Sequence, residues 1–182
     1  MKKIIVLLLI LASPLFAEKG TSNFKKVFTQ EEKQIFLDSM NKYRLAKGLK
    51  KVQYSIDAEK FAKIRTQTIY NHLKGLDSSE FVNNYRSHLH FGLYNDYLDF
   101  NTKLELYGNY KMPIVLENVI FIPRKEVEDL LSKCFEGWKN SPGHWGAMMS
   151  EDIDHISLII DKNDLGIIAD LILFDKFNKK KK

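Results

Sequence analysis

The sequence predicts an α+β fold in which helices pack on the faces of a small, largely antiparallel sheet. Apolar residues recur at helical spacing in residues 29–48, 58–73 and 124–139, whereas residues 113–122, 153–160 and 166–174 form short apolar runs typical of strands. The resulting order is helix, helix, an irregular stretch, strand, helix, strand and strand. This order favours helices packed on the faces of a sheet whose strands run mostly antiparallel.

The first two predicted helices carry recognisable end signals. Thr29 and Glu32 are spaced as a capping box, and Gly48 follows the last apolar position as a helix stop. Asp57 is expected to cap the second helix, which ends at Gly75. Each helix has one apolar face, made by Ile35, Phe36, Met40 and Tyr43 in the first and by Ala58, Phe61, Ala62, Ile69 and Leu73 in the second.

The second half of the chain places a third helix between strands. Pro123 precedes residues 124–139, and "NSPG" at 140–143 is expected to stop that helix and form a turn. The cluster "DKND" joins the last two strands. Residues 76–112 have no periodicity and are rich in Asn, Asp, Tyr and His, and a connection of this length commonly carries function. With no internal repeat and no low-complexity linker, residues 29–176 are expected to form a single domain.

Residues 1–17 have the layout of a secretory signal peptide. Lys2 and Lys3 precede a short apolar run, Pro14 breaks it, and Ala17 offers a cleavage site, with Leu15 where a small residue is usual. The apolar run is shorter than the roughly 20 residues that span a membrane, which disfavours an uncleaved anchor. Residues 18–28 then form a short polar leader. We expect export to the periplasm, the cell surface or the medium.

The net charge of +5 comes from the two ends of the chain. The 28 basic residues include Lys2, Lys3 and the four lysines of the tail at 177–182, and the 22 that remain face 23 acidic residues. The domain therefore lacks the excess of positive charge that neutralises phosphates, which argues against nucleic-acid binding. The tail is expected to be solvated, with at most a weak, peripheral attraction to an anionic membrane or wall surface.

The chain has one cysteine, Cys134. A secreted chain of this size with a single thiol is not a disulfide scaffold, so its stability must come from packing. Cys134 lies on the apolar stripe of the third predicted helix, and no electropositive surroundings activate it as a nucleophile. It is expected to be a small buried hydrophobe.

The candidate site residues are ionisable side chains that their surroundings do not explain. Glu117 lies in the middle of an apolar strand, so it is expected to face solvent or to meet a donor, a cation or a histidine. His88 and His90 lie in the irregular stretch, and His144 follows the third predicted helix. Two histidines and a carboxylate are a common ligand set for catalytic zinc, so these residues are candidates for a divalent-metal site.

Several segments, taken in order, resemble the CAP superfamily, the fold of cysteine-rich secretory, antigen-five and pathogenesis-related proteins. They are "SHLHF", "ENVIF", "WKNSPGHWGAMM" and "DHISLII", and the earlier "MNKYRLAKGLKKVQYS" is similar to the family's first helix, where an Asn-x-x-Arg element is usual. The resemblance covers residues 30–175, and W-x-N-S-P-G-H is typical of bacterial members. It implies a three-layer α-β-α sandwich with a central cleft.

The resemblance also implies a cleft site of two histidines and an acid, able in some members to bind a divalent cation such as zinc. The first histidine is His88, from the family's Ser-His-x-x-Phe, and His90 competes with it one register away. The acid is Glu117, from the family's Gly-Glu-Asn element, and the second histidine is His144.

Two departures from the family pattern weaken a catalytic interpretation. Leu116 replaces the glycine before the acid, and Ser141 stands where many eukaryotic members have a second acid. The family carries diverse activities, so the fold alone does not define the function. We expect a non-enzymatic binding module for a lipid, a cell-wall polymer or an extracellular protein. The alternative is a divalent-metal-dependent hydrolase using His88, Glu117 and His144.

Overall fold

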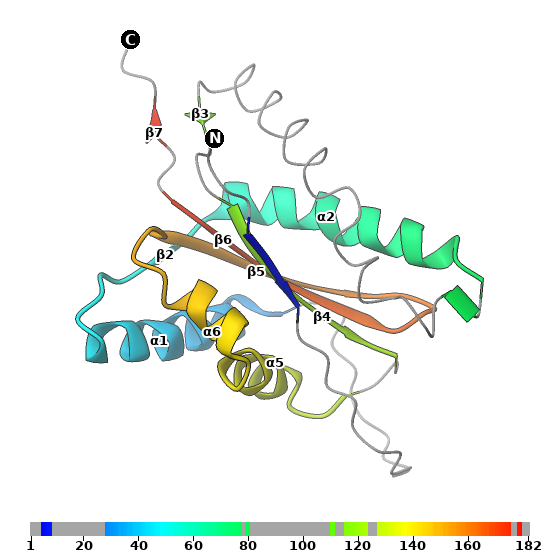
Figure 1. Ribbon diagram of the computed structural model, residues 1–182, viewed down its shortest axis with the longest axis horizontal. Helices are drawn as coiled ribbons and strands as arrows, with labels where there is room; N and C mark the ends of the chain where they lie inside the picture. The colour runs from blue at the N-terminus through cyan, green and yellow to red at the C-terminus, as the bar shows by residue number, and fades with distance from the viewer. Residues whose placement is uncertain are drawn as a thin grey trace.

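The computed structural model describes residues 5–8, 28–77, 79–80, 110–111, 115–123, 127–175 and 178–179. Their centre is a five-stranded sheet with the strand order β1-β4-β6-β5-β2 (Figure 1). These strands are β1 (Ile5–Leu8), β4 (Val115–Ile122), β6 (Ile167–Phe174), β5 (His155–Lys162) and β2 (Gln53–Tyr54). β4 and β5 pair antiparallel with β6, whereas β1 and β2 are parallel to their neighbours β4 and β5. A separate antiparallel pair joins β3 (Tyr110–Lys111) to β7 (Asn178–Lys179).

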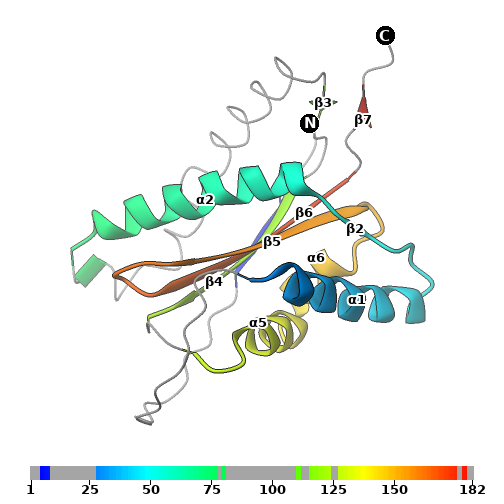
Figure 2. The ribbon, with the colours of Figure 1, turned by 180° about the vertical axis from the view of Figure 1, so that it is seen from behind.

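Helices cover both faces of this sheet. One face is covered by α2 (Ile56–Lys74), and the other by α1 (Gln30–Ala46), α5 (Leu130–Lys139) and α6 (Pro142–Met148) (Figure 1, Figure 2). Successive side chains of a strand point to opposite faces, so the apolar central strands need a helix layer on each side. The predicted α+β architecture, an α-β-α sandwich around a mostly antiparallel sheet, is confirmed.

The sheet divides the core into two clusters. On the α2 side the cluster consists of Ile69, Leu73, Val119, Phe121 and Ile168. The larger cluster on the other side includes Phe36, Met40, Ile120, Phe135, Trp138, Leu158 and Leu171. Phe36 joins α1 to α5, because its ring meets Phe135 and Trp138 edge to face with centroids 5.2 and 5.8 Å apart. If β4 slipped by one residue, the side chains that now face α2 would face the other helices, and the reverse. The packing of the two clusters therefore fixes which side chains of β4 face α2.

The first helix begins and ends where the sequence predicts. Thr29 is the N-cap of α1: its hydroxyl accepts the N–H of Glu32 at 3.2 Å, and the Glu32 carboxylate accepts the N–H of Thr29 at 2.8 Å. Gly48 has a φ of +75°, and its N–H donates to the carbonyl of Leu45. The capping box and the glycine stop are confirmed.

Several other boundaries differ from the prediction. The helix α2 starts earlier because Ser55, not Asp57, is its N-cap, with the Ser55 hydroxyl accepting a backbone N–H at 3.2 Å. The helix α5 begins at Leu130 rather than near residue 124, since Asp129 has the left-handed φ of +50°, which a continuous helix does not contain. The strand β5 continues to Lys162, two residues into the predicted turn.

The stretch after α5 is a second helix rather than an extended turn. α5 ends at Lys139, and only Asn140 and Ser141 separate it from α6. Pro142 occupies the first turn of α6, where its missing N–H removes no helical bond and its ring presets the backbone angle. The prediction of a turn over residues 140–143 is therefore wrong in its second half, and His144 lies inside a helix.

The strand β1 lies within the predicted signal peptide. Its four residues pair in parallel with residues 116–119 of β4. If the leader is removed after Ala17, as the sequence predicts, β4 becomes an edge strand. The predicted polar leader, apart from Phe28, and most of residues 76–112 lie outside the described residues. No helix in the described parts of the chain has the length and apolar character needed to cross a bilayer.

Gly166, in the turn between β5 and β6, is expected to tolerate a side chain poorly. Its φ is +153°, and a Cβ there would collide with the carbonyl oxygen of Ile122. Gly166→Ala should lower the free energy of unfolding by about 1–3 kcal/mol, measured by urea denaturation. Gly146→Ala in α6 is the control, because nothing lies within 4 Å of a Cβ built there. It should be neutral or stabilising, and equal losses at the two glycines would contradict this explanation.

Candidate functional site

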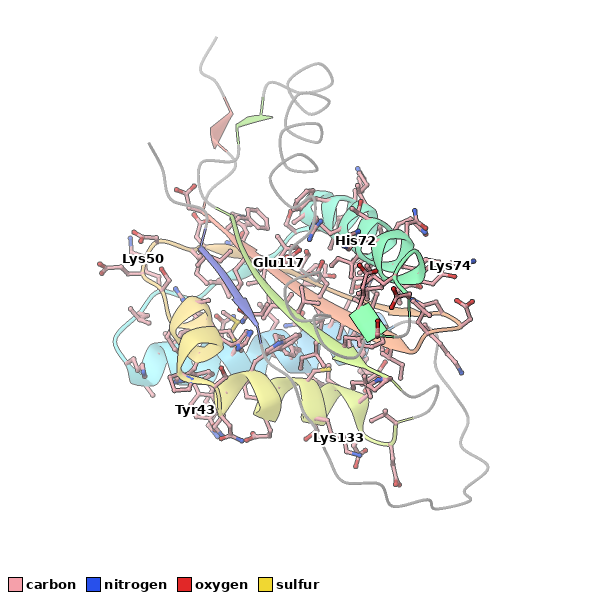
Figure 3. All side chains as sticks on the ribbon, turned by 45° about the vertical axis from the view of Figure 1, so that its right-hand side comes forward. Tyr43, Lys50, His72, Lys74, Glu117 and Lys133 are labelled. Atoms are coloured by element: carbon pink, nitrogen blue, oxygen red, sulfur yellow. The ribbon has the colours of Figure 1, made fainter. Side chains whose placement is uncertain are left out.

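Glu117, the acid predicted to lie in the cleft, is buried in an ion pair with Arg65. Arg65 comes from α2, and its Nε and Nη2 donate to the two carboxylate oxygens of Glu117 at 2.8 and 3.3 Å. Neither side chain is exposed to solvent. Figure 3 shows Glu117 on β4, on the side of the sheet that α2 covers. The sequence allowed Glu117 to face solvent or to meet a donor, a cation or a histidine. In the structure it meets the cation of Arg65 and does not face solvent.

A second buried acid, Asp170, accompanies this pair. It lies on β6 opposite Val119, so it is diagonal to Glu117 on the same face of the sheet. Within the described residues, neither carboxylate oxygen of Asp170 has a hydrogen-bond partner. Burial and then the negative charge of Glu117 raise the pKa of Asp170 well above its ordinary value, and Arg65 opposes this rise. The Arg65 guanidinium therefore lies near two carboxyl groups, and within the described residues it donates hydrogen bonds to Glu117.

Asp170→Asn is expected to stabilise the protein at neutral and alkaline pH. The raised pKa means that the folded state holds the Asp170 proton more tightly than the unfolded chain. This group therefore lowers stability as the pH rises through the ordinary aspartate range and up to the raised value. Asparagine cannot ionise, so the free energy of unfolding of the variant should not fall with pH in this way. At neutral pH it should exceed that of the unmodified protein by about 1 kcal/mol or more.

Urea denaturation from about pH 4 to about pH 8 measures the effect, since this range starts at the ordinary aspartate value. Asp152→Asn, in the exposed turn before β5, is the control and should leave the pH profile unchanged. The explanation would fail if Asp170→Asn kept the slope of the unmodified protein.

His144, predicted to be aimed at the cleft by a turn, is buried within α6. Its Nδ1 lies 2.7 Å from the hydroxyl oxygen of Ser141, the N-cap residue of that helix. The backbone carbonyl of His144 accepts a hydrogen bond from the Asn118 amide at 3.2 Å, which ties α6 to β4. Ser141, the residue in place of the family's second acid, therefore orients the His144 ring.

Glu117 and His144, two of the predicted site residues, lie on opposite sides of β4. The Glu117 side chain points to α2, whereas the neighbouring Asn118 points to α6 and His144. His88 and His90 lie outside the described residues. In the described ranges, no group of three or more His, Cys, Asp or Glu side chains is arranged to hold a metal ion. The Glu117 carboxylate accepts two hydrogen bonds from Arg65, and because His88 and His90 lie outside the described residues, the metal site of His88, Glu117 and His144 stays a prediction.

The Asn-x-x-Arg element of α1 fixes two connecting segments, the one after α1 and the one after α6. The Asn41 amide donates to the carbonyl of Val52 at 3.0 Å and its oxygen accepts the Val52 N–H at 2.8 Å. The buried Arg44 guanidinium donates to four carbonyl oxygens at 2.8–3.2 Å, those of Lys50, Met148, Ser150 and Ile153. Three of these carbonyls lie between the end of α6 and the start of β5, so Arg44 fixes the position of the helix that carries His144.

A groove of about 310 Å³ lies between α1 and α5. Its lining is mixed and includes Ile35, Phe36, Lys42, Tyr43, Phe135 and Glu136. The Tyr43 ring lies 5.2 Å from that of Trp145 and 6.0 Å from that of Phe135, between centroids. Lys139 lies over Tyr43 at 5.0 Å, and Figure 3 shows Tyr43 beside α5, across the sheet from α2. The groove therefore combines aromatic surface with nearby ammonium groups.

Cys134, expected to be structural, and His155 both have surroundings that fit a structural role. Cys134 lies in the core, and burial raises the pKa of its thiol to about 12, so little thiolate exists at neutral pH. The Nδ1 of His155 lies 2.5 Å from Asp154 Oδ1, and its ring stacks on Phe174 with centroids 5.6 Å apart.

Arg65 and Asp170 are the residues of this site that the sequence analysis missed. Arg65 falls on the apolar face of the second predicted helix, three residues after Ala62 and four before Ile69. Asp170 interrupts the apolar run at 166–174. A charge within an apolar pattern is the signal that singled out Glu117, and applied to these two positions it would have found them as well.

Comparison with solved structures finds similarity to three bacterial proteins. An outer surface protein from Borrelia burgdorferi is 18% identical with a TM-score of 0.51, over 84% of this chain and 98% of that one. A cysteine-rich secretory protein from Staphylococcus aureus Mu50 is 19% identical (TM-score 0.45, 80% of this chain and 39% of that one). An extracellular SCP-domain protein from Bacillus anthracis Ames is 14% identical (TM-score 0.47, 80% and 41%). The chain thus spans about two fifths of the length of the last two.

Among curated proteins, no sequence gives a significant match. At 18% identity and a TM-score of 0.51, the Borrelia burgdorferi structure supports the fold alone. The family assignment rests on the sequence model of the cysteine-rich secretory protein family, which matches residues 37–166 of the 182. This range contains the Asn-x-x-Arg element, Glu117 and His144. The chain therefore belongs to the cysteine-rich secretory protein (CAP) family.

Proposed function

We propose that this chain is an exported cell-envelope CAP domain that binds a lipid, a cell-wall polymer or another protein without cleaving it. The observation that carries the proposal is the ion pair between Arg65 and Glu117. Glu117 is the acid that the family pattern offers as metal ligand or general base. Inside this protein a guanidinium already neutralises it through two hydrogen bonds.

Binding zinc through Glu117, or activating water with it, would compete with the two hydrogen bonds that Arg65 donates to its carboxylate oxygens. Breaking a buried ion pair leaves an uncompensated charge and costs about 3–5 kcal/mol. The guanidinium left behind would also repel a divalent cation at short range. The alternative function, a divalent-metal-dependent hydrolase using His88, Glu117 and His144, is therefore supported less well than binding.

The groove between α1 and α5 is a surface suited to such binding. Its volume of about 310 Å³ matches part of a ligand, such as a stretch of acyl chain, a sugar ring or an apolar side chain. The rings of Phe36, Tyr43 and Phe135 give the groove apolar area, and Lys139, which does not line it, lies over Tyr43 at its margin. Aromatic surface beside ammonium groups favours a ligand with an apolar or sugar body and a polar or anionic head.

The proposed location rests on the amino terminus. Residues 1–17 carry the pattern of a secretory signal, which would direct the domain out of the cytoplasm and then be removed. The Borrelia burgdorferi protein with the same fold is an outer surface protein, which makes an envelope location for this chain a reasonable analogy.

Ile35 and Leu45 offer a matched pair for the test. Both are apolar residues of α1, exposed to 51% and 52%, but only Ile35 lines the groove. The mature chain, residues 18–182, is sedimented with phosphatidylglycerol vesicles and separately with purified cell-wall sacculi, with and without EDTA. We expect saturable binding to one of these probes that survives EDTA. Ile35→Glu should weaken it about tenfold, and Leu45→Glu should not.

Two outcomes would count against this proposal. Turnover of the probe, or binding that EDTA abolishes, would favour the metal-dependent hydrolase. Equal loss of binding in Ile35→Glu and Leu45→Glu would remove the groove between α1 and α5 as the binding surface.

A further inference from the structure

A second groove, of about 590 Å³, lies between α1 and α2 along β5. The side chains that the two helices contribute to its described lining are mainly polar and include Thr29, Gln30, Lys33, Glu59, Lys63, Thr66 and Gln67. Its volume falls in the range of about 300–1,000 Å³ that is typical of small-molecule sites. The groove is separate from the one between α1 and α5, because the two have no described lining residue in common.

Lys33 of α1 is held almost out of solvent in this groove, with a side chain only 10% exposed. Its ammonium donates to Glu59 Oε2 at 2.7 Å and lies 5.5 Å from the centroid of the Tyr54 ring. A lysine is rarely buried without partners, and an ammonium has three N–H donors. Within the described residues, Glu59 is the single hydrogen-bond acceptor of this ammonium, so Lys33 retains donors for a further acceptor.

Glu59, by contrast, has both of its carboxylate oxygens occupied. Besides Lys33, the Tyr54 hydroxyl donates to Oε2 at 2.7 Å, and the Lys63 ammonium lies 3.3 Å from Oε1. The same Tyr54 hydroxyl lies 3.2 Å from the carbonyl oxygen of Leu158 in β5. Burial raises the pKa of Glu59, but the hydrogen bonds from Lys33 and Tyr54 outweigh burial and hold this pKa below its ordinary value. Glu59 is therefore charged at neutral pH.

The charges at this end of the groove do not balance. Lys33 and Lys63 carry two positive charges, and Glu59 carries one negative charge. Asp161, the other acid of the described lining, is three residues along β5 from Leu158, which places it about 10 Å away. An excess of one positive charge favours a ligand group with one negative charge, such as a carboxylate, over a phosphate group with nearly two.

The rest of the lining suits a peptide better than a sugar acid. The Gln30 and Gln67 side chains each have a carbonyl acceptor and amide donors, and these complement the N–H and C=O groups of a peptide. Phe28 is the one aromatic residue of the described lining, and it is only 6% exposed. The groove therefore offers little ring surface to a sugar.

We propose that this groove binds the carboxy-terminal end of a short peptide, whose free carboxylate accepts hydrogen bonds from the Lys33 and Lys63 ammonium groups. Capture of a terminal carboxylate is a recurring mode of peptide recognition, and charged donors strengthen it. The peptide extends from the two lysines past the glutamines. This inference rests on the proposed function in treating the chain as a binding module, but it concerns a different groove.

Lys63 and Lys74 provide matched variants for the test. Both are exposed lysines of α2, each beside one other side chain: Lys63 next to Glu59 and Lys74 over the Tyr70 ring. Only Lys63 lines the groove along β5. Lys63→Gln therefore removes an ammonium from the groove without entering the core, and Lys74→Gln makes the same chemical change elsewhere.

The probes are four acetylated tripeptides that end in alanine, leucine, lysine or glutamate, each prepared as the free acid and as the carboxamide. They are titrated into the mature chain and followed by amide resonances in NMR spectra. We expect saturable shifts in residues 28–33 and 59–67 with at least one free acid, and about tenfold weaker binding of its carboxamide. Lys33→Gln, with its fold verified by circular dichroism, should cost about tenfold or more in affinity. Lys63→Gln should cost about fivefold, and Lys74→Gln less than about twofold.

Ile35→Glu should leave tripeptide binding unchanged, so failure at this groove is distinguishable from failure at the groove between α1 and α5. Three results would overturn the proposal: no saturable shift with any free acid up to about 10 mM, equal affinity of acid and carboxamide, and equal effects of Lys63→Gln and Lys74→Gln. Glucuronic acid is titrated in parallel, and tighter binding of it than of every tripeptide would identify a sugar acid as the occupant. Tripeptide binding that appears only when residues 18–27 are deleted would identify the chain's own leader as the occupant.

Discussion

Arg65→Met is expected to destabilise the protein more than any other single change at the candidate site, by about 3–5 kcal/mol. The substitution leaves Glu117 and Asp170 buried on one face of the sheet without their counterion. Glu117 also loses the hydrogen bonds at 2.8 and 3.3 Å. Urea denaturation at neutral pH measures the loss in the free energy of unfolding.

The order of stability among related variants separates a lost counterion from a simple loss of packing. Glu117→Gln leaves Arg65 with Asp170 as its counterion, so it should cost less than Arg65→Met. A triple variant that combines Arg65→Met, Glu117→Gln and Asp170→Asn contains none of these buried charges, and it should recover much of the loss. A cost below about 1 kcal/mol for Arg65→Met would show that Arg65 is not the counterion.

Arg44→Met should cost a similar amount, about 3–5 kcal/mol, because several buried carbonyl groups lose a charged donor. The guanidinium of Arg44 serves four carbonyl oxygens, three of them in the segment from Met148 to Ile153. The connection between α6 and β5 should therefore loosen first. Thermal denaturation measures the stability, and faster amide exchange in residues 148–154 would locate the change.

Two other substitutions on α1 test this explanation. Arg44→Lys keeps the positive charge, but an ammonium group cannot reach all four carbonyl oxygens, so an intermediate loss of about 2 kcal/mol is expected. Lys42→Met changes an exposed residue of the same helix and should be nearly neutral. If Arg44→Met were no more harmful than Lys42→Met, the role assigned to Arg44 would be wrong.

The first helix was predictable in detail because local chemistry sets its ends. The capping box at Thr29 and the left-handed Gly48 depend only on nearby residues. Other boundaries depend on distant contacts. β5 continues to Lys162 because that residue pairs with Ile167 of β6, and the pairing takes precedence over the turn propensity of "DKND". Likewise, Pro142 can begin a helix as well as follow one, so the "NSPG" sequence alone does not decide between a turn and a helix start.

The sequence indicated that Glu117 needs a partner but did not identify it. Arg65 is 52 residues away, and it reaches Glu117 only because α2 lies across that face of the sheet. Arg65 and Asp170 both interrupt apolar patterns, which marks them as charges to be explained, but an arginine on an apolar helix face can also extend its head group to solvent. The sequence alone therefore does not pair Arg65 with Asp170 or with Glu117.

A zinc titration of the mature chain at neutral pH, followed by isothermal calorimetry, is the most direct test of the central claim. Because Arg65 engages Glu117, we expect no saturable uptake that depends on Glu117 or His144. The variants Glu117→Gln and His144→Gln remain polar, and circular dichroism verifies that they fold. Saturable uptake of one zinc ion per chain that both variants abolish would contradict the claim and restore the metal-dependent hydrolase as the better interpretation.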